Sequence, residues 1–215
     1  MRGSSAAPPL IREALYSASS NLFSESGLNL DQEGVWDDLG DIEFTGEVAV
    51  ENFKKIKTFV KDVLVSDQKL VSLGGDHSVS WPILDAHLDK WDALDILHID
   101  AHPDLYESLL GNKLSHASPF ARIMETGRAS RLVQVGIRTL NKHQREQAEK
   151  FGVEIYQMKD LTKLSSLSFS KPVYCSIDID ALDPAYAPGV SHFEPGGLST
   201  RQAIDYINGF KGRLI

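Results

Sequence analysis

Hydrophobic and polar positions follow two periods along this chain. Between residues 47 and 64, apolar side chains recur every three or four positions with lysines between them, which predicts an amphipathic helix. Residues 69–73 and 93–99 are short, mainly apolar runs, a pattern typical of strands that are buried on both faces. The same two patterns predict further helices at 8–15, 81–90, 118–126, 142–151 and 200–210, and further strands at 131–137, 153–156 and 172–177.

Strands and helices therefore alternate over most of the chain, which is the order that βαβ units require. We expect one α/β domain over residues 1–215, with a mainly parallel sheet. Residues 24–41 are polar and acidic and contain three glycines, so we expect them to form a surface connection. In open parallel sheets, ligands bind beyond the carboxyl ends of the strands, so polar residues that directly follow strands are the first candidates for a site.

The composition of the chain excludes several kinds of binding partner and site. Hydrophobic residues make up 42% of the chain, which is enough for a core. The net charge of −8, from 22 basic and 30 acidic residues, argues against a nucleic-acid partner. No apolar stretch reaches the roughly 18 residues of a membrane span, so we expect no membrane association. The single cysteine, Cys175, excludes a disulfide within the chain and a thiolate zinc site.

The single cysteine also fits a reducing compartment, and we expect a cytoplasmic protein. The first twenty residues contain several serines, two arginines and one acid, and they are similar to an organelle transit peptide, which makes a mitochondrial location the alternative. In the same segment, the Pro8-Pro9 pair before a run of apolar and helix-forming residues favours a helix start.

Three polar motifs follow predicted strands. The first, Gly74-Gly75-Asp76-His77-Ser78, contains two glycines that allow the backbone a sharp turn. His77 is a candidate metal ligand, although a single histidine at a strand end is more often structural. Asp76 is equally suited to cap a helix that starts near Val79. This motif therefore indicates a metal site only in combination with the other two.

The second motif is His98-Ile99-Asp100-Ala101-His102-Pro103-Asp104. Alternate side chains of extended backbone share a face, so Asp100, His102 and Asp104 project to one side. Two carboxylates and an imidazole suit a divalent cation. His98 lies on the same side of the preceding strand, either as a neighbour that orients the ligands or as a buried core histidine, and the sequence favours the core.

The third motif, Ser176-Ile177-Asp178-Ile179-Asp180-Ala181-Leu182-Asp183-Pro184, ends another predicted strand. Asp178 and Asp180 share one face, and two acids at the end of an apolar strand are costly unless a cation neutralises them. Asp183 precedes a proline, so it shapes the turn or orients a ligand.

Together the motifs supply four carboxylates and two imidazoles, from Asp100, Asp104, Asp178, Asp180, His77 and His102. Four carboxylates carry a charge of −4, which two divalent cations neutralise and one does not. Oxygen-rich ligation with one histidine per ion, and without sulfur, favours Mn²⁺ over zinc. We therefore expect a site for two Mn²⁺ ions.

A fourth feature, Ser115-His116-Ala117-Ser118, lies shortly after the second motif. A histidine close to the metals can shuttle protons, whereas the spacing alone favours a surface histidine.

These segments resemble a known family. GGDHSVS, DAHPD with the later SHASPF, and SIDIDALDPAYAPGVSHFEPGGLS match, in order and in ligand positions, the three signature segments of the ureohydrolases, the family of arginases and agmatinases. The segment DAHPDLYESLLGNKLSHASPFARIMETG is most similar to plant-type arginases. The resemblance runs from about Pro8 to the end of the chain. It implies a three-layer α/β/α fold with a binuclear manganese centre.

The resemblance also assigns roles. It implies two overlapping ligand sets, with His77, Asp100, Asp104 and Asp178 for one ion and Asp100, His102, Asp178 and Asp180 for the other. It implies that His116 is a proton shuttle or general acid and that Asp104 steers the attacking hydroxide. The implied reaction is hydrolysis of a guanidino group with release of urea.

L-arginine, which would give ornithine and urea, is the expected substrate. Agmatine, which lacks the α-carboxylate, and other guanidino compounds are the alternatives. Candidate substrate contacts are Tyr106, Asn112, Lys113, Ser115 and Asp183. Lys113 can meet a carboxylate, which favours an amino acid, while a solvated lysine is the commoner role of such a residue.

The sequence departs from the family pattern at both ends. In the family, a late strand carries an acid that grips the guanidinium, and this sequence reaches Ile215 as that strand begins. The opening strand and glycine-rich loop of the family are also missing from it. We therefore expect a fold that lacks terminal strands, with weak or no turnover.

The family commonly forms trimers or hexamers, which we expect here as well. Two other functional classes stay open at this point. One is a non-catalytic metal-binding protein, and the other is a deacetylase-like hydrolase with a single zinc.

Overall fold

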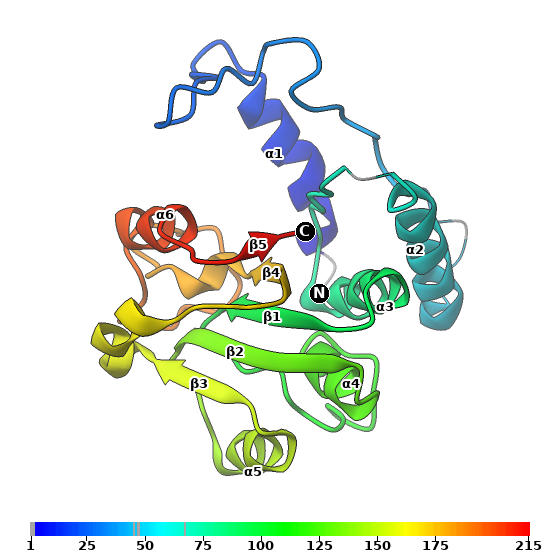
Figure 1. The fold of residues 1–215 in the computed structure, drawn as a ribbon, viewed down its shortest axis with the longest axis vertical. Helices are drawn as coiled ribbons and strands as arrows, with labels where there is room; N and C mark the ends of the chain where they lie inside the picture. The colour runs from blue at the N-terminus through cyan, green and yellow to red at the C-terminus, as the bar shows by residue number, and fades with distance from the viewer. Residues whose placement is uncertain (1–2, 45, 47, 67) are drawn as a thin grey trace.

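The computed structural model describes residues 3–44, 46, 48–66 and 68–215. Its centre is a five-stranded parallel sheet in the order β3-β2-β1-β4-β5 (Figure 1). The strands are β1 (Leu94–Ile99), β2 (Ala129–Ile137), β3 (Glu154–Gln157), β4 (Pro172–Ile177) and β5 (Arg213–Leu214). The α-helices are α1 (Ala7–Leu15), α2 (Ala49–Val63), α3 (Ser80–Lys90), α4 (Pro119–Glu125), α5 (Lys142–Phe151) and α6 (Thr200–Asn208). The 3₁₀ helices are η1 (Ser4–Ala6), η2 (His77–Val79), η3 (Met158–Ser166) and η4 (Ile179–Ala181).

The central strand, β1, is buried along its whole length between β2 and β4. Leu94 and Ile96 project into a core that includes residues of α3, α4 and α5. Leu97 and Ile99 project to the opposite face, into a core that includes residues of η3 and α6. Because both faces are covered, apolar residues are favoured along the strand, which explains why four of its six residues are apolar. The parallel sheet between two helical layers confirms the predicted α/β class.

One predicted strand was wrong. Residues 69–73 join no ladder, and Val71 is 84% exposed. Both edges of β1 are already taken by β2 and β4, so this run has no place beside the central strand. The other predicted helices and strands begin and end within two residues of the expected positions. Glu47, the first residue of the helix predicted at 47–64, lies outside the described residues.

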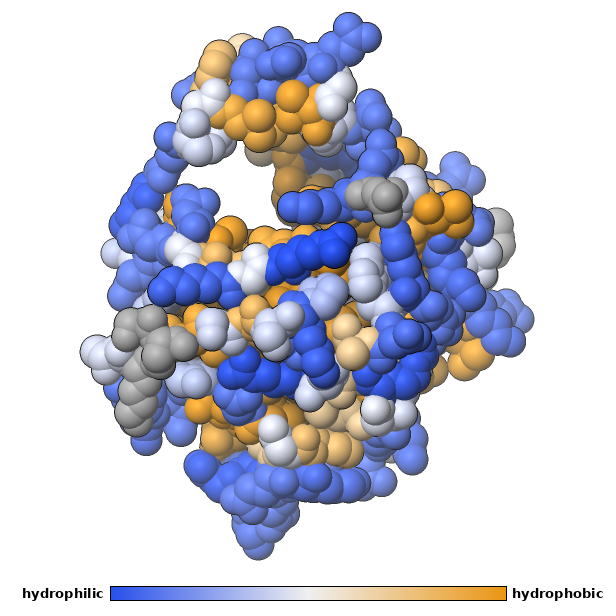
Figure 2. Space-filling model, in the orientation of Figure 1, coloured by the Kyte–Doolittle hydropathy of each residue, from blue (hydrophilic) through white to orange (hydrophobic). Residues whose placement is uncertain are grey.

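The N-terminal part of the chain stands apart from the sheet. Residues 16–44 form a largely irregular arm beyond α1, and the surface connection expected at 24–41 lies within it (Figure 1). Arg12 of α1 forms ion pairs with two residues near the end of this arm, Asp38 at 2.8 Å and Asp41. Glu25, in the middle of the arm, pairs with Arg201 of α6. Apolar side chains remain exposed on this arm (Figure 2).

Helices α2 and α3 pack together through Ile56 and Val60 on one side and Ile83 on the other. Beside this contact, Asp89 of α3 lies 3.1 Å from Lys57 Nζ, 3.0 Å from Lys61 Nζ and 2.7 Å from Arg128 Nη2. Burial raises the pKa of Asp89, but the three cations outweigh it and lower the pKa to about 2. In the part of the chain that the structure describes, no helix has the length and apolar character needed to cross a membrane.

Candidate metal centre

The second and third motifs meet at the carboxyl ends of two neighbouring strands. The Asp100 N–H donates to the carbonyl of Val135 at 3.0 Å, and the Asp178 N–H donates to the carbonyl of Ile99 at 2.9 Å. Both aspartates therefore stand where the ladders of β1 and β4 end. His77, at the start of η2, reaches the same point from the first motif. The structure thus brings together the three motifs that the sequence placed at strand ends.

His77 lies at the centre of three carboxylates. Its Nδ1 is 3.1 Å from Asp100 Oδ2, 3.0 Å from Asp104 Oδ2 and 3.4 Å from Asp178 Oδ2. This nitrogen is buried, and none of the three oxygens is aligned for a hydrogen bond from it. One imidazole proton cannot satisfy three carboxylates, whereas a cation among them can. The other ring nitrogen, Nε2, lies 3.0 Å from Ser176 Oγ, which fixes the ring.

His102 occupies the corresponding position on the other side of Asp100. Its Nδ1 lies 3.2 Å from Asp180 Oδ2 and 3.4 Å from Asp100 Oδ1. Ligand atoms of Asp100, His102 and Asp180 all lie within 4.8 Å of one another. Asp100 is 1% exposed and has one oxygen toward each histidine, which is the arrangement that a carboxylate shared by two ions requires.

The charges of the site call for cations. Burial, together with the Asp100 carboxylate, raises the pKa of Asp104 to about 7, and burial with Asp100 and Asp180 raises that of Asp178 to about 6. Burial lowers the pKa of His102, but Asp100 and Asp180 outweigh it and raise the pKa to about 10. Protons on the histidines thus balance the carboxylates, and divalent cations would replace those protons on binding. The residues fit a pair of such ions.

Two backbone features hold the ligands in place. Asp104 has a φ of 50°, a left-handed conformation that aspartate tolerates better than most residues, and this turn carries its carboxylate to His77. Gly136 on β2 has a φ of 94°, and a Cβ there would lie 3.1 Å from the carbonyl oxygen of Asp100. Only glycine allows β2 to come so close to the start of the second motif.

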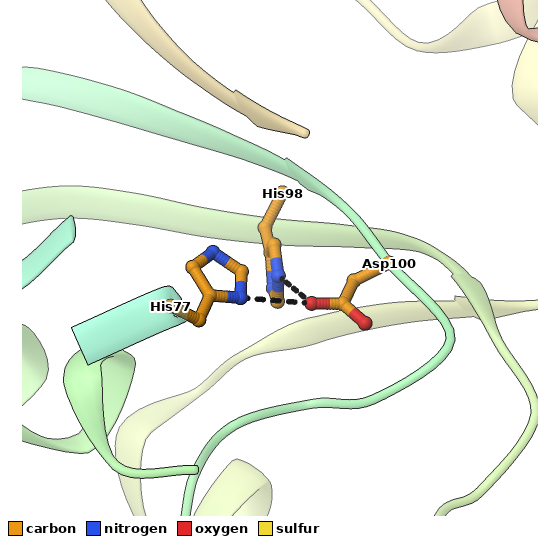
Figure 3. A group of neighbouring side chains, drawn as sticks. All are labelled: His77, His98 and Asp100. Carbon is orange, nitrogen blue, oxygen red and sulfur yellow. Dashed lines mark hydrogen bonds and ion pairs between the residues drawn. The ribbon is translucent and has the colours of Figure 1, made fainter. Parts of the chain in front are cut away.

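His98 is both a core residue and a neighbour of a ligand (Figure 3). It is fully buried and stacks on Phe120, with 3.9 Å between ring centroids. Its Nε2 lies 2.7 Å from Asp100 Oδ2, and its Nδ1 lies 3.0 Å from Gln134 Nε2. Burial lowers the pKa of His98 to about 4, so the ring is neutral at neutral pH. Because both nitrogens have partners, His98 orients Asp100 and is not itself placed to ligate an ion.

Two of the candidate substrate contacts, Asn112 and Ser115, line one cavity with His116. This cavity of about 350 Å³ is lined by Asp76, Ser78, Leu109, Leu110, Asn112, Leu114, Ser115 and His116. Partial burial lowers the pKa of His116. Lys113 is exposed and lies outside this lining. Asp76 caps η2 by accepting the Ser78 N–H at 3.0 Å, the role that the sequence allowed for it.

Asp183 serves the loop after the third motif. Its carboxylate accepts backbone N–H groups from Ala185 at 3.0 Å, Gly196 at 2.7 Å and Gly197 at 3.2 Å. These bonds lower the pKa of Asp183. The geometry favours the turn-shaping role over substrate contact.

Sequence reasoning missed three residues around the site. His192 lies between His102 and His116, with ring centroids 5.1 Å and 6.4 Å away. Arg138 follows β2 and donates to the carbonyls of Asp180 and Glu194, each at 2.7 Å, which joins the loop of the third motif to the segment that carries His192. The third is Gln134, whose signal was a polar residue inside an apolar strand.

Comparison with known proteins agrees with this geometry. The model of the Arginase family matches residues 1–215. Arginase 1, mitochondrial, of Oryza sativa subsp. indica is 46% identical over 229 residues, which cover 100% of this chain and 67% of that protein. An agmatinase of Bacillus cereus is 37% identical over 173 residues, covering 79% of this chain and 60% of that protein.

Solved structures give the same result. The arginase from Medicago truncatula superimposes with a TM-score of 0.91 at 42% identity, covering 100% of this chain and 73% of that chain. This chain therefore spans about two thirds of the length of the rice relative and nearly three quarters of the solved arginase. From the fold, the convergent ligand set and the match over its whole length, the chain belongs to the arginase family.

Proposed function

We propose that this chain hydrolyses the guanidino group of L-arginine to give ornithine and urea, with two manganese ions. The observation that carries the proposal is the cluster of four carboxylates and two imidazoles at the ends of β1 and β4, in a member of the arginase family. Arginine is favoured over agmatine because the identity to the rice arginase exceeds that to the bacterial agmatinase.

The family resemblance implies two ligand sets, and the distances around His77 and His102 support them. His77, Asp100, Asp104 and Asp178 would hold one ion, and Asp100, His102, Asp178 and Asp180 would hold the other. Carboxylate oxygens with one imidazole per ion favour manganese. When bound, two such ions supply the positive charge that lowers the pKa of a water molecule toward neutrality.

The protein's own groups would handle the protons and the substrate. Asp104, whose Oδ2 faces His77 at 3.0 Å, would accept a hydrogen bond from the attacking hydroxide and orient it. His116, whose pKa is lowered, would relay a proton between the cavity and the leaving amine. The cavity wall formed by Asn112 and Ser115 would contact the amino acid end of the substrate. Lys113 is exposed beside this wall and would have to turn toward it to meet the carboxylate.

The test is urea release from arginine and from agmatine, measured side by side on this chain with added Mn²⁺. We expect slow release, faster from arginine than from agmatine, and we expect Asp180→Ala to lose Mn²⁺ and activity together. Activity that survives Asp180→Ala would contradict the two-metal site. Mn²⁺ binding without urea from either substrate would identify a metal-binding protein without turnover.

Assembly and location are further parts of the proposal. A homotrimer or homohexamer is expected from the family, and light scattering of the purified chain tests it. The names of relatives such as the rice protein include the word mitochondrial, which supports the mitochondrial alternative over the cytoplasmic one.

A further inference from the structure

A row of polar side chains crosses the sheet directly beneath the metal ligands. His98 on β1 is the register partner of Gln134 on β2 and of Ser176 on β4. Gln134 and His98 are fully buried, and Ser176 is 6% exposed. Polar groups in an apolar sheet are costly unless hydrogen bonds compensate them. At one end of the row, Ser176 Oγ lies 3.0 Å from His77 Nε2. Gln134 stands at the other end.

Gln134 is oriented by a backbone carbonyl. Its Nε2 lies 2.6 Å from the carbonyl oxygen of Pro103, which can only accept a hydrogen bond. The amide nitrogen, and not the amide oxygen, must therefore face Pro103. The same nitrogen lies 3.0 Å from His98 Nδ1 and donates its second hydrogen there. His98 Nδ1 consequently accepts and carries no proton.

Because Nδ1 carries no proton, the proton of the His98 ring must be on Nε2. This nitrogen lies 2.7 Å from Asp100 Oδ2 and donates to it, while Phe120 holds the ring plane by stacking. The amide oxygen of Gln134 is buried without a hydrogen-bond partner, a cost that an apolar residue in its place would avoid. That cost is understandable if the amide is retained to fix the His98 tautomer.

We propose that Gln134 and His98 are positioning residues of the metal centre, which hold Asp100 in the orientation in which two ions can share it. Pro103, Gln134, His98 and Asp100 form one relay of hydrogen bonds, in which each donor is fixed by the group before it. The inference rests on the proposed function in one respect, because it takes Asp100 as a metal ligand. Partners of this kind usually change metal affinity by about 10- to 100-fold.

The tautomer can be read directly in the metal-free protein by NMR of the ¹⁵N-histidine-labelled chain. His87 is an internal reference, because its Nδ1 faces the carbonyl oxygen of Ile83 at 2.9 Å and must carry the proton. We expect opposite tautomers, with the proton on Nε2 in His98 and on Nδ1 in His87. A proton on Nδ1 of His98 would overturn the proposal, and this measurement needs no variant to fold.

The effect on the metal is measured by calorimetric titration with Mn²⁺. We expect His98→Leu and Gln134→Met each to weaken Mn²⁺ affinity by about 10- to 100-fold. His98→Gln, whose amide can donate from nearly the same position as Nε2, should restore most of the affinity. The matched control is His87→Leu, which removes another buried histidine, on α3 and stacked on Trp91, and should leave the affinity unchanged.

Wild-type affinity in both His98→Leu and Gln134→Met would contradict the proposal, and so would an equal loss in His87→Leu. If the wild-type chain binds no Mn²⁺, the proposed function fails, while the His98 tautomer in the metal-free chain still decides whether the relay exists.

Discussion

Replacing Asp178 with asparagine should change the stability of this protein in opposite directions without and with metal. Burial and the carboxylates of Asp100 and Asp180 raise the pKa of Asp178 to about 6, so its charged form is disfavoured in the metal-free protein at neutral pH. Asparagine keeps the volume, and it keeps an oxygen that can accept the Asp180 N–H, now at 3.0 Å. The substitution therefore removes an unfavourable charge with little loss of structure.

The size of the expected change in stability follows from the raised pKa of Asp178. A folded-state pKa raised from 3.8 to about 6 means that stability falls as pH rises between those values, by at most about 3 kcal/mol. The Asp178 side chain is 34% exposed, and solvent screening reduces this to roughly 1 kcal/mol. Metal-free Asp178→Asn should thus melt about 2–4 °C higher than the wild type at neutral pH.

With Mn²⁺ the sign reverses. Only three carboxylates would remain for two divalent ions, and one unit of charge at about 4 Å is worth on the order of 4 kcal/mol at an effective dielectric constant of 20. Mn²⁺ affinity should therefore fall by roughly 10³-fold, since about 1.4 kcal/mol corresponds to a factor of ten. The wild type should be stabilised by excess Mn²⁺, and the variant much less.

Thermal unfolding followed by circular dichroism, in chelator and in excess Mn²⁺, measures both effects. Asp183→Asn is the matched control, because Asp183 follows the same strand but its carboxylate accepts backbone N–H groups of Ala185 and Gly196. It should lower stability equally in both conditions. A lower melting temperature of metal-free Asp178→Asn would refute the charge argument, and full stabilisation of that variant by Mn²⁺ would show that Asp178 is not a ligand.

Three further outcomes are expected. His116→Asn should lower kcat for urea release by about 10²- to 10⁴-fold in steady-state assays and leave Mn²⁺ affinity unchanged; a parallel loss of metal would place His116 among the ligands. Gly136→Ala should lower the unfolding free energy in urea by about 1–3 kcal/mol and weaken Mn²⁺ binding, because its Cβ would lie 3.1 Å from the Asp100 carbonyl oxygen. The pKa of Asp89 is lowered, so its ion pairs should contribute roughly 1 kcal/mol to the free energy of unfolding above about pH 4, and this contribution should be lost as pH falls toward 2. Unfolding curves measured over a series of pH values should lose this dependence in Asp89→Asn.

The fold was predictable from the sequence where burial determines which residue types an element contains. β1 is mainly apolar because both faces of the sheet are covered there. The helix α5 coincides with its predicted range, with Asn141 capping one end and Gly152 ending the other. The run at 69–73 failed for the complementary reason. An apolar run does not specify a partner, and pairing depends on which edges the rest of the sheet leaves free.

The site was predictable to the extent that its residues stand at strand ends. The ligand positions follow from alternation within each motif and from parallel strands ending at the same edge. The hydrogen bonds between His98 and Gln134 could not be predicted from the sequence, because these two residues become neighbours only through the register of β1 with β2. His192 is placed beside His102 by a returning loop that Asp183 and Arg138 hold, and no local pattern in the sequence specifies such a return.

The central claim is that this site binds two divalent cations. Equilibrium dialysis of the chain against Mn²⁺, followed by metal analysis, counts them directly. Four carboxylates around two histidines predict two ions per chain in the wild type, and fewer than two in Asp180→Ala, which lacks a ligand of the ion beside His102. Saturation at one ion per chain, or two ions retained in Asp180→Ala, would contradict the account.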